Sequence, residues 1–173
     1  TLSAYAALMA LDAPTGHFQE MIEAFDYGNN RESIFTIHGA RVQLHLAKNP
    51  IGFQQKISLV LKDPAPKDVI IQINDTYQDG EDISWLWDVD FQYLADANAA
   101  TITTNGTRRH DMGLRLKYED IDCGSTTDLK GTIETLTTAG TKNLYVIVNY
   151  SGLYRTNHLL TGMDDNRKEA GES

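Results

Sequence analysis

The sequence has a single cysteine, Cys123, among its 173 residues. One cysteine cannot form an internal disulfide, and it excludes a cysteine-rich zinc site within the chain. Apolar runs are also short: none approaches the roughly 20 residues that a helix needs to cross a bilayer, so we expect no membrane span. Residues 1–11 lack the basic flank and the cleavage site of a secretory signal. These features together predict a cytoplasmic protein.

Basic residues are in the minority: Lys and Arg number 15, Asp and Glu number 24, and the net charge is −9. Because phosphate binding requires a clustered basic surface, this balance argues against nucleic acid as a partner. The acidic residues gather in two stretches, 75–90 and 164–172. The second is expected to be a solvated tail. The first also holds Trp85 and Trp87, which a merely solvated stretch would not carry.

Common catalytic motifs are absent from the sequence. It contains no Gly-Lys-Ser or Gly-Lys-Thr, no GxSxG and no HExxH, so the chain alone is not expected to hold ATP through a phosphate loop. We expect no cofactor and no metal site within it. An isolated cysteine without an identified base is usually structural, and Cys123 is predicted to be so.

The apolar fraction of 41% and the charged fraction of 23% are those of a soluble globular protein. Asn49-Pro50 is typical of a helix start, and Gly39 of a hairpin turn. Met112, Leu114 and Leu116 are the expected buried residues of one helix. The apolar periodicity predicts helices over 3–11, 17–25, 51–62, 107–119, 127–138 and 151–161, and strands over 33–38, 41–47, 68–74, 100–104 and 143–149.

Strands alternate with helices after residue 48, which indicates an α/β fold. We expect a three-layer, Rossmann-like arrangement with a mainly parallel sheet and helices on both faces, preceded by a short helical pair and a hairpin. In such sheets ligands bind beyond the carboxyl ends of the strands. Polar stretches follow three predicted strands, at 74–90, 105–111 and 149–154. The sequence therefore predicts a site where these stretches meet.

The stretch 79–91 (DGEDISWLWDVDF) combines five acidic residues with two tryptophans directly after an apolar strand. In one interpretation the tryptophans anchor a loop and the acids stay solvated, as aromatic residues in strand-end loops usually pack. In the other, Trp85 and Trp87 form a rigid platform that presents a carboxylate to a substrate or partner.

Two further pairs of residues are candidates for binding. Lys48 and Asn49 fit a helix start, and Lys48 could also meet a phosphate or a carboxylate. Arg108 and Arg109 stand at a predicted helix N-terminus, where they are either solvated or bind an anionic group beside the helix dipole.

Three ordered stretches resemble the C-terminal domain of the MurT family: LAKNPIGF (46–53), INDTYQDGEDISWLWDVDF (73–91) and NGTRRHDMGLRLKYEDI (105–121). NNRESIFTIHG (29–39) is similar to that family's junction between central and C-terminal domains. The resemblance covers roughly residues 1–160. It implies the end of a Mur ligase central domain and a connector over 1–32, a MurT-type C-terminal domain over 33–162, and a flexible tail over 163–173.

The resemblance implies a function. MurT is the Mur ligase-like subunit of lipid II isoglutaminyl synthase, which pairs with a glutaminase subunit, GatD. The pair amidates the α-carboxyl of the stem-peptide D-glutamate in peptidoglycan synthesis, with glutamine as nitrogen donor. ATP, Mg²⁺ and lipid II would be bound by the full-length protein, and the isolated domain is expected to be inactive.

The family's C-terminal domain is understood to supply an aspartate to the Cys–His site of the glutaminase. Asp88 is the first choice here because it follows the second tryptophan, and Asp82 and Asp75 come next. The expected substrate- or partner-binding residues are Trp85, Trp87, Lys48, Asn49, Arg108 and Arg109.

Two other interpretations remain open at this point. One is an ordinary Mur ligase C-terminal domain that binds an incoming amino acid. Such domains typically carry an Asp-Asn-Pro-Arg-like loop, in whose place this sequence has the residues 74–77, Asn-Asp-Thr-Tyr. The other is a non-catalytic protein-binding module that uses the surface of Trp85 and Trp87.

Overall fold

The computed structural model describes residues 2–11, 15–18 and 32–167. Its helices are α1 (Leu2–Ala10), α3 (Pro50–Lys62), α4 (Arg109–Lys117), α5 (Leu129–Thr138) and α6 (Tyr150–Met163). Its strands are β1 (Glu32–Ile37), β2 (Ala40–Leu46), β3 (Lys67–Gln72), β4 (Ala99–Asn105), β5 (Gly124–Ser125) and β6 (Asn143–Val148). Between β3 and β4 lie the short 3₁₀ helices η1 (Tyr77–Asp79), η2 (Ser84–Asp88) and η3 (Phe91–Asp96).

The strands form one six-stranded sheet in the order β1-β2-β6-β3-β4-β5. β1 and β2 make an antiparallel hairpin, and every other pair is parallel. The hairpin turns at His38 and Gly39, which both have positive φ angles, as a two-residue turn between twisted strands requires. The mainly parallel α/β sheet expected from the sequence is confirmed.

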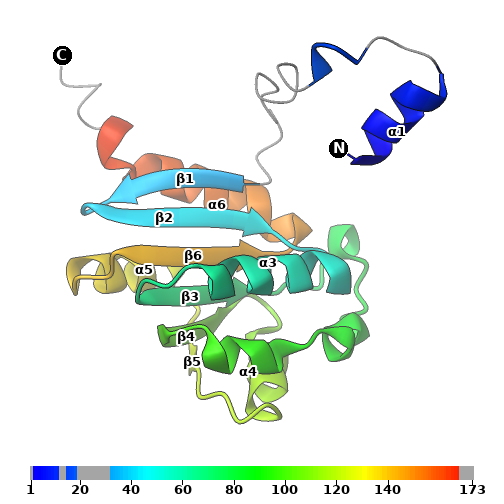
Figure 1. Ribbon diagram of the computed structural model, residues 1–173. Helices are drawn as coiled ribbons and strands as arrows, with labels where there is room; N and C mark the ends of the chain where they lie inside the picture. The colour runs from blue at the N-terminus through cyan, green and yellow to red at the C-terminus, as the bar shows by residue number, and fades with distance from the viewer. Residues whose placement is uncertain (1, 12–14, 19–31, 168–173) are drawn as a thin grey trace.

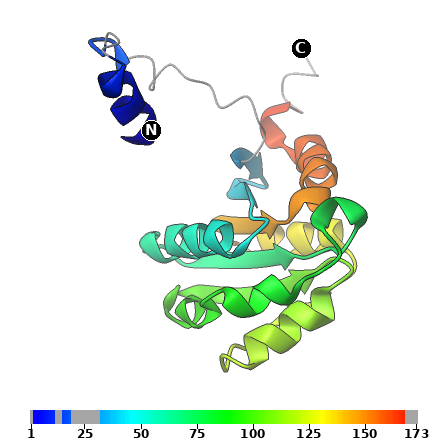
Figure 2. The same ribbon diagram turned by 90° about the vertical axis from the view of Figure 1, so that its right-hand side faces the viewer.

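Helices cover both faces of the sheet (Figures 1 and 2). α3, α4, η2 and η3 pack on one face, and α5 and α6 pack on the other. Strand β3 shows how the sequence produces two cores. Val69 and Ile71 point into the first, Ile70 points into the second, and all three are fully buried. Successive side chains of a strand alternate between the two faces of the sheet. Since helices cover both faces of β3, its central residues are all apolar.

A buried lysine ties the 3₁₀ segment to the rest of the fold. The ammonium of Lys67 donates to the carbonyls of Val60 (3.2 Å), Ala97 (2.7 Å) and Asp63. Val60 belongs to the last turn of α3, where unpaired carbonyls favour a cation. Ala97 ends η3, so this one side chain joins the end of α3 to the end of the segment that carries the tryptophans.

Several local expectations need correction. Leu114 is 52% exposed, and Arg115 takes its place between Met112 and Leu116 on the buried side of α4. The segment after β3 folds into 3₁₀ helices, which the sequence reading did not foresee, and strand β5 was also missed. Of the helix expected over 17–25, all but two residues lie outside the described residues.

The expected tail over 163–173 is in part attached to the fold. A side-chain oxygen of Asp164 accepts from the backbone N–H of Thr36 at 3.0 Å, and one of Asp165 accepts from Gly39 at 3.2 Å. Asp164 and Asp165 therefore contact the β1–β2 hairpin. The flexibility expected of the tail stays a prediction. Residues 168–173 lie outside the described residues.

Candidate functional site

The carboxyl ends of β3, β4 and β6 meet in a network of amide side chains. Asn149, directly after β6, accepts from the backbone N–H of Asn74 (3.1 Å) and donates to its carbonyl (2.7 Å). The Asn74 side-chain oxygen in turn accepts from the backbone N–H of Thr107 at 3.1 Å. Gly106 has φ +93°, and a Cβ there would lie 2.3 Å from the carbonyl oxygen of Ile73. The close approach of these strand ends therefore requires glycine at this position.

Asp75 is held at this edge by two neighbours from the β4–α4 turn. One carboxylate oxygen accepts from the Thr107 hydroxyl at 2.7 Å, and the other accepts from Nε of Arg108, also at 2.7 Å. The Thr107 hydrogen bond, with the Arg108 hydrogen bond and charge, holds the pKa of Asp75 below its ordinary value. Of the two roles expected for Arg108, solvated side chain or anion-binding group, the structure shows the second at the start of α4. The anion is the carboxylate of Asp75 in the same chain.

Replacing Thr107 by valine is expected to raise the pKa of Asp75 toward its ordinary value, since the largest contribution that lowers it is removed. A carboxyl group whose pKa is lower in the folded state than in the unfolded state stabilises the fold at pH values above its unfolded-state pKa. That stabilisation disappears as the pH falls through the folded-state pKa. The Thr107→Val protein should therefore lose less stability than the parent between roughly pH 5 and pH 3. NMR titration of the side-chain carboxyls measures the shift.

Asp82 serves as an internal control in the same titration. Its pKa is also lowered, through hydrogen bonds from the backbone and side chain of Ser84, and Thr107 is not among its partners. An unchanged Asp75 pKa in Thr107→Val, or an equal shift at Asp82, would contradict this account of the carboxylate.

Asp79 occupies the start of α6. It accepts from the backbone N–H of Ser151 at 2.9 Å through one oxygen. The other accepts from the backbone and hydroxyl of Thr76, at 3.2 and 2.7 Å. The first turn of a helix favours a negative charge, and here the chain supplies it from η1. This role of Asp79 is visible only once η1 and α6 are brought together, because Ser151 is distant from it in the sequence.

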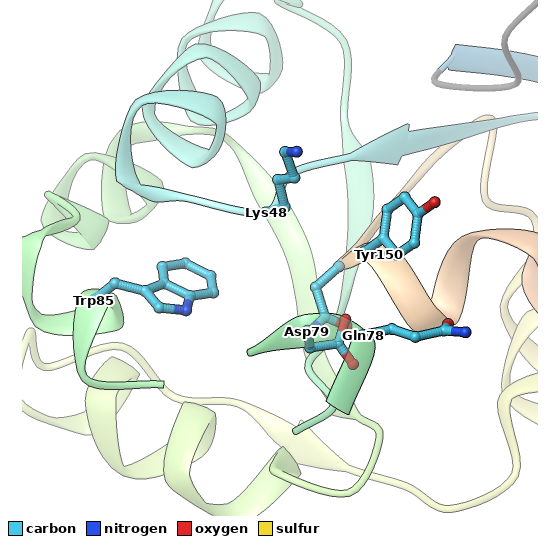
Figure 3. A pocket seen from close by; sticks show the side chains of 6 residues that line it. Lys48, Gln78, Asp79, Trp85 and Tyr150 are labelled. Carbon is cyan, nitrogen blue, oxygen red and sulfur yellow. The ribbon is translucent and has the colours of Figure 1, made fainter. Parts of the chain in front are cut away.

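A cavity of about 250 Å³ opens beside Asp79, lined by Lys48, Gln78, Asp79, Trp85, Asn149 and Tyr150. Figure 3 shows the Trp85 ring on one side, Asp79 and Tyr150 across from it, and Lys48 on the loop above. A second cavity of about 420 Å³ is lined by Gln72, Asn74, Thr76, Tyr77, Gln78, Thr107, Ser151, Gly152 and Arg155. Neither lining set contains a histidine or a cysteine.

The two tryptophans of η2 have different environments. Trp85 is half-buried and packs against the first core, with its ring centroid 5.4 Å from that of Phe53. Trp87 is 54% exposed and makes an edge contact with Tyr118 at 5.3 Å. The interpretation of the tryptophans as anchors of a loop therefore holds for Trp85.

The two rings should therefore differ in their effect on stability. Trp85→Ala is expected to lower the free energy of unfolding by about 3 kcal/mol, near the lower limit for a core tryptophan because the ring is partly exposed. Trp87→Ala should cost about 1 kcal/mol, the value of one aromatic pair or one cation–π contact. Chemical denaturation of both variants measures the difference, and equal losses would show that Trp85 is not the anchor.

Arg115 holds the turn of η2 that carries Trp87 and Asp88. It is 5% exposed, and its guanidinium donates to the carbonyls of Leu86 (3.2 Å) and Val89 (2.8 Å). Its remaining nitrogen pairs with Glu119. The guanidinium carbon also lies 5.2 Å from the centre of the Trp87 ring. Sequence reasoning did not single out Arg115, since an arginine on a helix is ordinarily solvated.

The candidate acids Asp82 and Asp88 differ in the hydrogen bonds that their carboxylates accept within the domain. Both oxygens of Asp82 accept from Ser84, at 2.8 Å from its N–H and 3.0 Å from its hydroxyl. Asp88 ends η2, is exposed, and forms no hydrogen bond or ion pair within residues 32–167. Of the three candidates, Asp88 is the one whose acceptor sites are all open to another molecule, whereas the carboxylates of Asp82 and Asp75 each already accept two hydrogen bonds.

The remaining predicted residues have local roles. Asn49 is the N-cap of α3, and its side chain accepts from the Gly52 N–H at 2.8 Å, so the expected helix start is confirmed. Arg109 donates to the Gly106 carbonyl at 3.3 Å. Lys48 lines the smaller cavity. The structure thus divides the predicted residues between the carboxyl edge of the sheet and the η2 segment.

Comparison with known proteins identifies the family. The model of the MurT ligase C-terminal family matches residues 46–153, which include the tryptophan segment, the lining of the smaller cavity and all of the larger cavity's lining except Arg155. The chain belongs to the MurT ligase C-terminal family. This membership confirms the resemblance seen in the sequence, and it decides against an ordinary Mur ligase domain.

Relatives of this MurT-family chain carry the name lipid II isoglutaminyl synthase (glutamine-hydrolyzing) subunit MurT. The protein from Streptococcus pneumoniae is 30% identical over 142 residues, which cover 80% of this chain and 32% of the relative. The protein from Staphylococcus aureus strain COL is 31% identical over 121 residues, which cover 70% of this chain and 28% of the relative. The chain thus spans about a third of the length of the relatives it matches.

Residues 2–11, 15–18 and 32–167 contain no helix that is both long enough and apolar enough to cross a membrane. In the same part of the chain, no three or more His, Cys, Asp or Glu side chains are grouped so that they could hold a metal ion.

Proposed function

We propose that this chain is the C-terminal domain of the ligase subunit of a lipid II isoglutaminyl synthase, where it docks a GatD-like glutaminase and lends it an aspartate. The observation that carries the proposal is the free, exposed carboxylate of Asp88 on a turn that Arg115 holds in place. Membership in the MurT family supports it, as does the glutamine hydrolysis in the relatives' names.

The proposed chemistry uses Asp88 as the third member of a Cys–His–Asp site. The carboxylate accepts from one ring N–H of the glutaminase histidine, which fixes the tautomer so that the other ring nitrogen faces the cysteine. When the histidine takes the thiol proton, the negative charge stabilises the imidazolium that forms. Docking would also remove water from Asp88, and the interaction is stronger in a site of lower dielectric.

Asp82 and Asp75 are less suited to this role. Asp82 directs both oxygens to Ser84 and holds its own loop. Asp75 directs its oxygens to Thr107 and Arg108, and the Arg108 charge would weaken its ability to stabilise a second cation. The hydrogen bonds that each of them already accepts shape the domain and fill part of its acceptor capacity, so a histidine N–H finds a more open carboxylate at Asp88.

We further propose that ATP, Mg²⁺ and lipid II are bound mainly by other parts of the ligase subunit. The residues described here fit a phosphate group poorly, because the Asp79 carboxylate already occupies the start of α6 and Arg108 is paired with Asp75. ATP would activate the substrate carboxyl for attack by ammonia. The contribution of this domain is to the release of that ammonia from glutamine.

Co-expression of the complete ligase subunit with its glutaminase tests the proposal. With ATP and glutamine, the complex should amidate lipid II, whereas the ligase subunit alone should do so only when ammonium is supplied instead of glutamine. Amidation from glutamine by the ligase subunit alone, or addition of an amino acid in place of ammonia, would contradict the proposal.

A further inference from the structure

The backbone on both sides of Asp88 is anchored by one buried side chain. Arg115, on α4, is 5% exposed. Its Nε donates to the carbonyl of Leu86 at 3.2 Å, and one terminal nitrogen donates to the carbonyl of Val89 at 2.8 Å. These carbonyls belong to residues just before and just after Asp88 in the chain. Because the guanidinium is planar and rigid, its donors fix the relative placement of the two peptide groups around the aspartate.

Further contacts restrict the same turn. The side chains of Leu86 and Val89 are buried in the first core. The backbone N–H of Asp90 donates to the side-chain oxygen of Gln54, on α3, at 3.2 Å. The chain is therefore held before and after Asp88, whose own side chain is exposed. Since the backbone conformation limits the rotamers of a side chain, the Asp88 carboxylate can point in only a few directions.

The charge of Arg115 is balanced without Asp88. Its other terminal nitrogen pairs with Glu119, four residues further along the chain. The guanidinium carbon also lies 5.2 Å from the ring centre of Trp87 and 5.5 Å from that of Phe91, and aromatic rings attract a cation at such distances. Each nitrogen of the guanidinium thus has a partner other than Asp88. Arg115 supports the turn and leaves the acceptors of the aspartate open.

We infer that Arg115 is a positioning residue for glutamine hydrolysis, an inference that rests on the function proposed above. Because Arg115 is buried, it acts on the reaction through Asp88, whose carboxylate must come within hydrogen-bond distance of a histidine N–H. A misplacement of about 1 Å in a catalytic group can lower the rate roughly 100-fold. Supporting side chains locked by packing and hydrogen bonds hold such a group in its productive geometry, and Arg115 provides that support for Asp88.

Steady-state glutamine hydrolysis by the complex of the complete ligase subunit with its glutaminase tests the inference. Arg115→Ala should lower kcat roughly 100-fold. The KM for glutamine should stay within about twofold, since a buried arginine does not touch glutamine. Arg115→Lys should fall between the parent and Arg115→Ala, because an ammonium can donate to one carbonyl but cannot reproduce the fork of the guanidinium.

Ile133→Val is the control for an unspecific loss of stability. Ile133 is fully buried in the second core, on the opposite face of the sheet. Removing one methylene there weakens the core without touching η2, so kcat should not change. A loss of kcat in Ile133→Val equal to that in Arg115→Ala would contradict the inference.

Combining Arg115→Ala with Asp88→Asn distinguishes positioning from a general structural role. If Arg115 acts only through Asp88, adding Arg115→Ala to Asp88→Asn should lower the residual kcat by less than about twofold, because residues that act as a unit are not additive. A further loss of roughly 100-fold in the double variant would show that the two residues act independently, and the positioning role would be wrong.

The outcomes also separate this inference from the proposed function. If Asp88→Asn abolishes hydrolysis while both Arg115 variants keep a normal kcat, the positioning role is wrong and the proposed function stands. If Asp88→Asn hydrolyses glutamine normally, the proposed function loses its acid and the inference fails with it. If neither Arg115 variant co-elutes with the glutaminase on size-exclusion chromatography, Arg115 is required for the fold as a whole, which overturns a role exerted through Asp88.

Discussion

Asp88→Asn is expected to lower glutamine hydrolysis by the ligase–glutaminase complex by roughly 10⁴-fold in turnover, the size of the effect when the aspartate of a Ser–His–Asp triad becomes asparagine. Asparagine keeps the shape of the side chain. It loses the negative charge that stabilises the imidazolium, and it can offer an N–H where an acceptor is needed. Steady-state release of glutamate measures the loss, which should appear mainly in kcat because glutamine itself does not touch Asp88.

Association should survive this substitution, since Asp88 adds little apolar area to the interface. Co-elution of the Asp88→Asn ligase subunit with the glutaminase on size-exclusion chromatography provides that readout. Asp90→Asn is the matched control, because Asp90 is exposed and lies two residues further along. Normal hydrolysis in Asp88→Asn would remove Asp88 from the mechanism, and Asp82→Asn and Asp75→Asn would then be tested. If all of them remain active, the domain docks the glutaminase without lending it an acid.

Arg115→Ala is expected to lower the free energy of unfolding by roughly 2–6 kcal/mol, because the carbonyls of Leu86 and Val89 would lose buried donors worth about 1–3 kcal/mol each. The Trp87 ring would also lose the cation beside it. Chemical denaturation measures the change. Arg115→Lys should fall between the parent and Arg115→Ala, because an ammonium cannot reproduce the planar fork of the guanidinium.

Arg155→Ala is the control for this prediction. Arg155 is exposed on α6 and lines the larger cavity, and a surface substitution of this kind changes stability by no more than about 0.5 kcal/mol. A similar small change in Arg115→Ala would show that the η2 turn is held by something other than the guanidinium.

The sheet and its covering helices could be predicted from the sequence because burial determines their pattern. β3 and β6 lie between two layers and contain the continuous apolar runs 69–71 and 144–148. Asn49-Pro50 marks the start of α3 by its capping chemistry. The family could be predicted as well, because its motifs follow one another in the expected order over most of the matched range.

The segment between β3 and β4 could not be predicted in the same way. A 3₁₀ helix of three to six residues has no amphipathic period long enough to be recognised. The hydrogen bonds of two of the aspartates come from partners distant in the sequence. Asp79 accepts from Ser151, and Asp75 accepts from Thr107 and Arg108. Sequence could place the acids in one segment, but it could not show which carboxylates are engaged.

Helix α4 shows a related limit. The spacing from Met112 to positions 115 and 116 is that of one helical face, and those residues are the buried ones. Reading by residue type instead placed Leu114 inside, because leucine is more often buried than arginine. Arg115 is buried because two backbone carbonyls and Glu119 satisfy its donors. The two carbonyls come from the η2 turn, which has no sequence signature.

The central claim is that this domain completes the active site of a glutaminase. The most direct test is the structure of the complete ligase subunit bound to that glutaminase. The account predicts a carboxylate oxygen of Asp88 within hydrogen-bond distance, about 2.6–3.2 Å, of a ring nitrogen of the catalytic histidine. A complex in which the glutaminase contacts another part of the ligase, with no aspartate of residues 32–167 near that histidine, would contradict it.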